Sequence, residues 1–167
     1  MTNAGASRGK LQVSMPSERE IAMTRVFNAP KRLVFDALTK PELVKQWLLG
    51  PPGWSMPVCE IDLRVGGAYR FVWRNDTGGK EVNMGISGAF REIVVPERFV
   101  ATEKFDDAWY EGEAITTNQL VEDGGKTTLT LTILYESREI RDRVLKTPME
   151  EGVGASYDRL AALVEKP

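Results

Sequence analysis

The sequence contains no histidine and a single cysteine among its 167 residues. Without histidine, the chain can assemble neither a Ser–His–Asp nor a Cys–His catalytic unit, and it can build no His-ligated metal centre. Cys59 on its own excludes an intrachain disulfide, a Cys-x-x-Cys redox pair and a structural zinc cluster. We therefore expect no metal and no other cofactor, and the lone thiol favours a cytoplasmic protein.

Long apolar runs and an excess of basic charge are also missing. Lys and Arg number 22 against 24 Asp and Glu, a formal net charge of −2, and the basic residues are spread along the chain. A nucleic-acid-binding domain needs a concentrated basic face, so we expect no nucleic-acid partner. No stretch is long and apolar enough to cross a bilayer, and the first ten residues hold no signal-peptide core, so we expect no membrane association.

A chain of this length supports one good-sized hydrophobic core, and hence one domain. Residues 1–18 are rich in Gly, Ser, Asn and charge, which is typical of a flexible leader. Beyond them, apolar residues recur with the regular periods of strands and helices. We predict a flexible leader at 1–18 and a single domain over 19–167.

Periodic apolar positions predict the order of the elements in this domain. A strand begins at Glu20 and stops at 28–30, and two short helices with a proline in the first turn follow it. Six more strands, separated by turns containing Gly, Asn, Asp or Pro, are predicted at 56–65, 68–74, 84–94, 98–105, 113–122 and 126–136. Ser137 caps a short helix, and a capping box at 147–150 begins a long amphipathic helix.

This order predicts an α+β fold with a seven-stranded antiparallel sheet and two short helices after the first strand. A sheet with one apolar face must cover that face, and the long C-terminal helix is the element available to do so. A strongly curved sheet wrapped around one helix, a helix-grip arrangement, leaves a cavity between the two. The architecture therefore predicts a ligand site.

Five blocks of the sequence resemble one known family. They are Val-Phe-Asn-Ala-Pro at 26–30 with Leu-Val-Phe-Asp-Ala at 33–37, Pro-Glu-Leu-Val-Lys-Gln-Trp at 41–47, Asp-Leu-Arg-Val-Gly-Gly-Ala-Tyr-Arg at 62–70, Pro-Glu-Arg-Phe-Val at 96–100, and Met-Glu-Glu-Gly at 149–152 with Tyr-Asp-Arg-Leu at 157–160. Together these blocks resemble the activator of heat-shock-protein-90 ATPase homologue-like family, over about residues 20–165. This family belongs to the START-related, Bet v 1-like (SRPBCC) group of helix-grip folds.

The resemblance implies more about fold than about function. Members of the family are mostly small bacterial proteins without an assigned role. Relatives in the wider group bind lipids, sterols, polyketides or hormones in the cavity, and some catalyse cyclisation or hydrolysis there. The eukaryotic co-chaperone carries a second, N-terminal chaperone-binding domain, and we expect no such domain in this chain because only about 18 residues precede the first predicted strand.

Aromatic and methionine side chains are the main candidates for a ligand pocket. Tyr69, Phe71 and Trp73 share one face of a predicted strand, since side chains alternate with period two. The full set of predicted ligand-binding residues is Trp47, Trp54, Phe71, Trp73, Met84, Phe90, Phe105, Trp109, Met149, Val153 and Tyr157. These residues line an apolar pocket under one interpretation and fill an ordinary core under the other. Gly152 and Gly154 similarly indicate either room for a ligand or a close approach of helix to sheet.

One carboxylate stands out as a candidate acid or base. Strict alternation places Glu103 on the same strand face as Phe99, Ala101 and Phe105, so it is predicted to point inward. Burial raises the pKa of a carboxyl group and allows it to act as a base. The alternative is a solvent-facing strand residue, so Glu103 is a weak catalytic candidate.

The leading hypothesis is binding of a small hydrophobic or aromatic ligand between the sheet and the C-terminal helix. One alternative is a cyclase or hydrolase of the same fold that uses an inward carboxylate. Another, implied only by the resemblance, is an interaction module that assists a chaperone ATPase in a stress response. An open sheet edge would also offer a contact for a weak homodimer.

Overall fold

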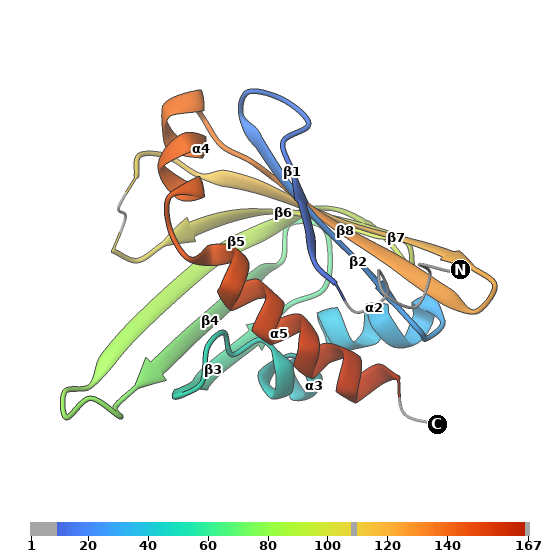
Figure 1. The fold of residues 1–167 in the computed structure, drawn as a ribbon, viewed down its shortest axis with the longest axis horizontal. Helices are drawn as coiled ribbons and strands as arrows, with labels where there is room; N and C mark the ends of the chain where they lie inside the picture. The colour runs from blue at the N-terminus through green and yellow to red at the C-terminus, as the bar shows by residue number, and fades with distance from the viewer. Residues whose placement is uncertain (1–9, 108–109, 166–167) are drawn as a thin grey trace.

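A computed structural model describes residues 10–107 and 110–165. The described elements, in chain order, are β1 (Gln12–Ser14), β2 (Glu20–Phe27), α2 (Lys31–Thr39), α3 (Pro41–Trp47), β3 (Trp54–Ile61), β4 (Ala68–Asn75), β5 (Val82–Val94), β6 (Arg98–Phe105), β7 (Ala114–Asp123), β8 (Lys126–Leu134), α4 (Arg138–Leu145) and α5 (Met149–Val164). The strands form a curved sheet, and α5 lies across one face of it (Figure 1). The predicted α+β helix-grip fold is confirmed.

The sheet has eight strands in the described part of the chain, where seven were predicted. Their order is β1-β2-β8-β7-β6-β5-β4-β3, and neighbouring strands in this order pair antiparallel. The extra strand is β1, which pairs Val13 with Met23 at the edge of β2. It lies inside the segment predicted as a flexible leader, so that prediction is wrong for residues 12–14. Leu11 and Val13 of this segment pack against the core, and open backbone groups along β2 pair with it.

The two short helices fill the end of the sheet nearest the C-terminus of α5. Both α2 and α3 contact α5, and the three helices lie together in Figure 1. Pro41 occupies the first turn of α3, as the sequence predicted. Among the described residues, no helix is long and apolar enough to cross a membrane.

Three hydrogen bonds hold α5 in place over the sheet. Ser156 accepts a hydrogen bond from the backbone N–H of Gly50 at 2.8 Å, and Arg159 donates one to the Gly50 carbonyl at 2.7 Å. At the C-terminal end, Glu165 accepts a hydrogen bond from the backbone N–H of Asn28 at 2.9 Å. These contacts fix the helix to the α3–β3 loop and to the end of β2, so the space beneath it has a defined shape.

Two clusters of buried side chains make up the core. The larger one joins α2, α3 and α5 to the sheet around Phe27, Phe35 and Trp47. The smaller one lies under α4 and includes Tyr110 and Tyr135. Residues of both clusters face a common space between α5 and the sheet, which is where the candidate site lies.

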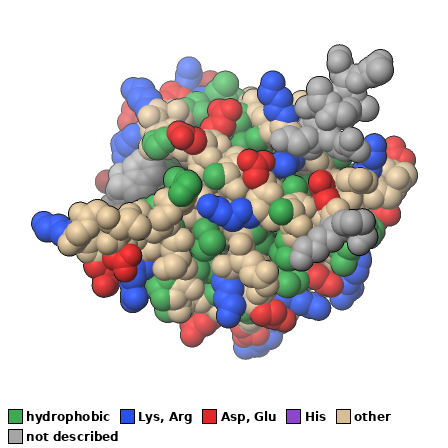
Figure 2. Space-filling view, turned by 60° about the horizontal axis from the view of Figure 1, so that its bottom comes forward, with side chains coloured by type: hydrophobic (Ala, Val, Ile, Leu, Met, Phe, Trp, Pro, Cys, Tyr) green, Lys and Arg blue, Asp and Glu red, His purple; other side chains and the backbone are tan. Residues whose placement is uncertain are grey.

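The outer surface carries charges of both signs. On the face shown in Figure 2, Lys and Arg side chains are interspersed with Asp and Glu, and single apolar side chains lie between them. Surface ion pairs link the strands: Arg98 on β6 pairs with Glu92 on the neighbouring β5, and Arg70 on β4 reaches across β5 to Asp106 at the end of β6. Charged groups thus gather outside the sheet, in contrast to the cavity inside it.

Candidate functional site

A cavity of about 580 Å³ lies between α5 and the sheet. Ten of the eleven predicted ligand-binding residues line it, and so does Glu103: Trp47, Trp54, Phe71, Trp73, Met84, Phe90, Phe105, Met149, Val153 and Tyr157. The eleventh, Trp109, lies outside the described residues. The spacing of aromatic and methionine residues therefore located the lining of one space, although their role in binding stays a prediction.

One wall of the cavity is an aromatic strand. Tyr69, Phe71 and Trp73 alternate along β4 and point the same way, because successive strand side chains face opposite sides of a sheet. Their rings touch in sequence, with centroids 5.1 Å apart for Tyr69–Phe71 and 5.9 Å apart for Phe71–Trp73. The Trp73 indole N–H donates to the Leu48 carbonyl at 2.6 Å, so the ring offers the cavity an apolar face.

The opposite wall comes from α3 and α5. The Trp47 indole N–H donates to the Ala37 carbonyl at 2.8 Å, and its ring centroid lies 6.0 Å from that of Tyr157. Both rings are almost fully buried, so they belong to the core and to the cavity wall together. Core packing and pocket lining, which the sequence posed as alternatives, are both true of these residues.

The glycines of α5 do not mark a close approach of helix to sheet. A Cβ added at Gly154 would meet nothing within 4 Å, and one added at Gly152 would lie 3.7 Å from the Pro51 side chain, an ordinary contact. Steric crowding therefore does not explain either glycine. Gly152 lines the cavity, which is consistent with the interpretation that the glycine leaves room there.

Several residues of the lining were not identified from the sequence. They include Ile86 and Phe99, together with polar residues from later strands: Thr116, Asn118 and Tyr135. Alternation with the buried Ala114 and Leu120 could have placed Thr116 and Asn118 inward. Tyr135 lies just beyond the end of β8 but continues the period-two face of Leu131 and Ile133, and the sequence predicted that shared face without assigning Tyr135 to the pocket.

Glu103 points into the cavity, as strand alternation predicted, and it is the only charged residue among the described residues that line it. Its register partner on β7 is the fully buried Ala114. On β5, the pairings Ile86–Phe105 and Phe90–Ala101 place Gly88 opposite it. The Thr102 carbonyl and the Tyr69 ring fill the space over Gly88, so Glu103 lies between the small Ala114 and an aromatic side chain. Burial raises the pKa of Glu103 from 4.5 to about 7, because the apolar surroundings disfavour the charged form.

Three tyrosines lie near Glu103. Burial, and secondarily the negative charge of Glu103, raise the pKa of Tyr69, Tyr110 and Tyr135 above the ordinary tyrosine range. The Tyr69 hydroxyl donates to the Thr102 carbonyl at 2.7 Å, and the rings of Tyr110 and Tyr135 meet edge to face at 5.8 Å. All three hydroxyls stay protonated at neutral pH, so Glu103 is the group in this part of the cavity whose charge changes there.

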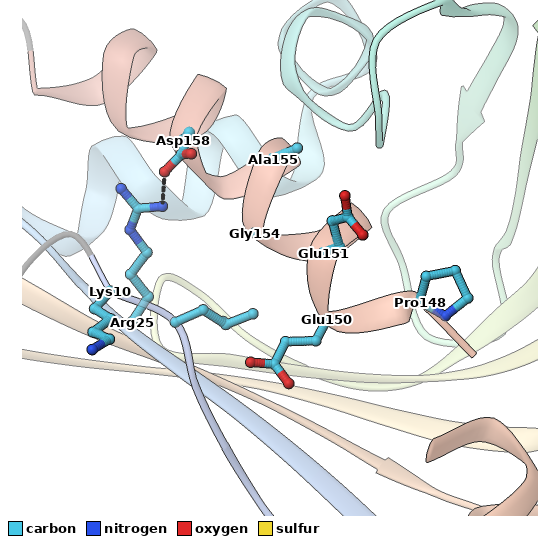
Figure 3. A pocket seen from close by; sticks show the side chains of 9 residues that line it. Lys10, Arg25, Pro148, Glu150, Glu151, Gly154, Ala155 and Asp158 are labelled. Atoms are coloured by element: carbon cyan, nitrogen blue, oxygen red, sulfur yellow. Dashed lines mark hydrogen bonds and ion pairs between the residues drawn. The ribbon is translucent and has the colours of Figure 1, made fainter. Parts of the chain in front are cut away.

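A second hollow lies on the face of α5 that turns away from the cavity (Figure 3). Charges of both signs line it, and Arg25 from β2 reaches Asp158 of α5, with Nη1 and Oδ1 2.7 Å apart. The Arg25 side chain is 6% exposed and also lies over the Phe27 ring, at 5.3 Å from its centroid. This ion pair ties α5 to the sheet, so we assign the hollow a structural role.

The remaining sequence candidates give no second chemical centre. Within the described residues, no three or more His, Cys, Asp or Glu side chains come together in a way that could hold a metal ion. Cys59 is half-buried, and burial raises the pKa of its thiol to about 11, which keeps it in the unreactive protonated form. The cavity with Glu103 is therefore the strongest candidate for a functional site in the described structure.

Known structures share this architecture. A protein from Rhodobacter sphaeroides is 28% identical with a TM-score of 0.86, and the match covers 93% of this chain and 98% of that one. A protein from Chromobacterium violaceum is 30% identical with a TM-score of 0.73, over 90% and 100% of the two chains. A Mycobacterium smegmatis protein, 21% identical with a TM-score of 0.80 over 93% and 98%, shows the fold alone.

The search of curated proteins gave no match. The family model described as Activator of Hsp90 ATPase homolog 1-like protein matches residues 28–165. That range runs from the end of β2 through the last turn of α5 and includes nearly the whole cavity lining. With the helix-grip fold in place as well, the chain belongs to the family of Activator of Hsp90 ATPase homolog 1-like proteins, within the START-related, Bet v 1-like (SRPBCC) group.

Proposed function

We propose that the protein binds a small hydrophobic or aromatic molecule in the cavity between the sheet and α5. The observation that carries this proposal is a space of about 580 Å³ lined by aromatic side chains. Native cores leave few voids larger than one water molecule, whereas this volume equals that of roughly 20 waters in the liquid. Ligand sites typically occupy about 300–1,000 Å³ and have mainly apolar linings with a few polar groups.

The walls of the cavity also support an adaptable pocket. Met84 and Met149 contribute flexible thioether side chains, which repack around ligands of different shape. Met84 is 42% exposed, so it lies at the rim and gives access from solvent. A ligand that displaces water from such an apolar lining gains about 25 cal/mol for each Å² of apolar surface that it buries.

A matched pair of variants tests the proposal. Ala101→Phe adds a ring to a buried position in the lining, while Ala162→Phe makes the same change at an exposed position of α5. The probe is N-phenyl-1-naphthylamine, an apolar fluorophore that brightens when it leaves water. We expect micromolar binding by the parent protein and by Ala162→Phe, and at least tenfold weaker binding by Ala101→Phe. No binding by the parent protein, or equal binding by all three proteins, would refute the proposal.

Catalysis by Glu103 is the second candidate function. The observation in its favour is the inward position of this carboxyl group in a cavity able to hold a substrate. A group with a pKa of about 7 is suited to exchange a proton at neutral pH, as a cyclase or hydrolase requires. Mass spectrometry of bound compounds after incubation tests it: conversion by the parent protein but not by Glu103→Gln supports catalysis, and recovery of unchanged compounds refutes it for those compounds.

A chaperone role is a prediction that follows from the family description, which names activation of the Hsp90 ATPase. Its test is pull-down of the host's heat-shock chaperone together with measurement of its ATPase rate. Absence of both effects would refute it.

We also propose a cytoplasmic location, supported by the unpaired Cys59, and a weak homodimer through the outer strand β3. Sedimentation over a concentration series tests the dimer, because a purely monomeric protein at high concentration would refute it.

A further inference from the structure

The charge distribution of the cavity indicates what kind of ligand it selects. Among the described residues of the lining, the Glu103 carboxyl is the only group that can carry a charge near neutral pH. The lining includes no Lys or Arg. The other polar groups of the lining are hydroxyls and one amide, such as Thr116 and Asn118. An isolated carboxylate is costly in apolar surroundings unless a partner compensates it.

The described part of the chain supplies no such partner. Within the described residues, Glu103 makes no hydrogen bond or ion pair, whereas the acidic groups on the outer surface, such as Asp106 and Glu92, pair with arginines at 2.6 Å. Glu103 lines the cavity and is only half-buried, so its side chain can be reached from that space. A ligand group can therefore pair with Glu103 without displacing a contact of the folded chain.

The rings around the carboxylate point to the charge of that ligand group. Tyr69, Tyr110 and Tyr135 lie close enough to Glu103 to sense its charge, and Phe105 follows two residues later on the same strand face. The face of an aromatic ring attracts cations, and cages of such rings recognise ammonium groups. An anionic ligand would instead meet the repulsion of Glu103 with no basic side chain in the lining to offset it.

We propose that the cavity selects ligands that carry a protonated amine on an apolar, preferably aromatic, body, with the ammonium group placed against the Glu103 carboxylate. This inference rests on the proposed binding function and narrows its ligand class. It separates the amine class from the fatty acids and other carboxylates that a purely apolar cavity would also accept. The amine donates its N–H groups to the two oxygens of Glu103, while the aromatic body lies against the wall formed by β4.

Three compounds of nearly equal size test this charge selection. They are 2-naphthylmethylamine, 2-naphthylmethanol and 2-naphthoic acid, which are cationic, neutral and anionic at pH 8. Binding is followed by calorimetry with the parent protein, with Glu103→Gln and with the control Glu60→Gln, which removes an exposed carboxylate from β3. The amine should bind the parent protein and the control roughly 10- to 100-fold more tightly than the alcohol, as expected for a charge-assisted hydrogen bond in a desolvated site. The acid should bind most weakly.

Binding of the three compounds by Glu103→Gln provides the second readout. Glu103→Gln should lose the preference for the amine over the alcohol and accept the acid more readily. Equal binding of amine and alcohol by the parent protein, or a preference that persists in Glu103→Gln, would overturn the inference and leave the binding function standing. If the parent protein binds none of the three compounds, the binding function itself fails. The comparison among compounds needs only the parent protein, so it holds even if a variant folds poorly.

Discussion

Replacement of Glu103 by Gln should make the protein more stable, and the gain should grow with pH. The Glu103 side chain is half-buried and faces the apolar cavity, where desolvation raises its pKa to about 7 from 4.5. The titratable groups that face it are the hydroxyls of Tyr69, Tyr110 and Tyr135, all of which stay protonated in this pH range. Above the unfolded-state pKa, the unfolded chain releases a proton that the folded chain retains, so stability falls as pH rises from about 4.5 to 7.

The size of the effect follows from this pKa shift. A shift of one pKa unit corresponds to about 1.4 kcal/mol, so the rise from 4.5 to about 7 lowers the free energy of unfolding by about 3 kcal/mol once the pH is well above 7. By the same relation, roughly 1 kcal/mol of this is already lost at pH 5. Glutamine has the same shape and no charge, so the stability of Glu103→Gln relative to the parent protein should increase by about 2–3 kcal/mol between pH 5 and pH 8.5.

Urea denaturation at these two pH values measures the effect directly. In thermal unfolding, 1 kcal/mol shifts Tm by about 2–4 °C for a chain of this length, so the gap should widen by about 5–10 °C. Glu60→Gln, on the exposed side of β3, is the matched control and should show the same difference from the parent protein at both pH values. A difference between Glu103→Gln and the parent protein that does not change with pH would refute the reasoning, because it would mean that the carboxyl group ionises as easily in the folded state as in the unfolded one.

Three further substitutions test the packing of the scaffold by urea denaturation. Gly154→Ala should stabilise the protein by about 1 kcal/mol, because an added Cβ meets open space in the interior of α5; a loss of stability would contradict this. Gly88→Ala should destabilise it by about 1–3 kcal/mol, since its Cβ would collide with the backbone carbonyl of Thr102; a neutral result would show that β5 and β6 can move apart. Ser137→Ala should cost about 1 kcal/mol, because Ser137 caps α4 by accepting from the Ile140 N–H at 3.1 Å; an unchanged midpoint would refute that contribution.

Most of the fold could be predicted because its strands are long and alternate clearly. In β8, Leu129 and Leu131 alternate with threonines, and turn residues such as Gly124 and Gly125 separate β7 from β8. The three-residue β1 was missed although Leu11, Val13 and Met15 alternate with polar residues, because this short pattern lies in a stretch whose overall composition is typical of a flexible leader.

The capping box predicted for α5 is also wrong. Thr147 donates its hydroxyl hydrogen to the Val144 carbonyl at the end of α4, and Pro148 becomes the N-cap of α5 without a side-chain hydrogen bond. The motif is present in the sequence, but α4 ends so close to the start of α5 that the Thr147 hydroxyl bonds to the last turn of α4. A local pattern does not indicate which of two adjacent helices will use a side chain.

The candidate site was predictable to the extent that it follows strand alternation. Period two placed Phe71, Trp73 and Glu103 on inward faces, and the structure brings all three to one cavity. Asn118 was missed because a polar residue on a strand is usually assigned to the solvent side. Its inward position is tolerable because the cavity gives the amide room to be solvated or to meet a ligand.

Because the chain has no histidine, any group of the cavity that titrates near neutral pH must be of another residue type. Tyrosine hydroxyls near Glu103 are held protonated by burial and by its charge, and the lining contains no lysine or arginine. Glu103 is therefore the one described lining group whose charge changes near neutral pH, and both the proposed amine selection and the proposed proton transfer rest on it. The two roles separate at pH 8, where the carboxylate is mostly ionised: amine selection should then be strongest, whereas catalysis by a protonated Glu103 acting as a general acid should decline.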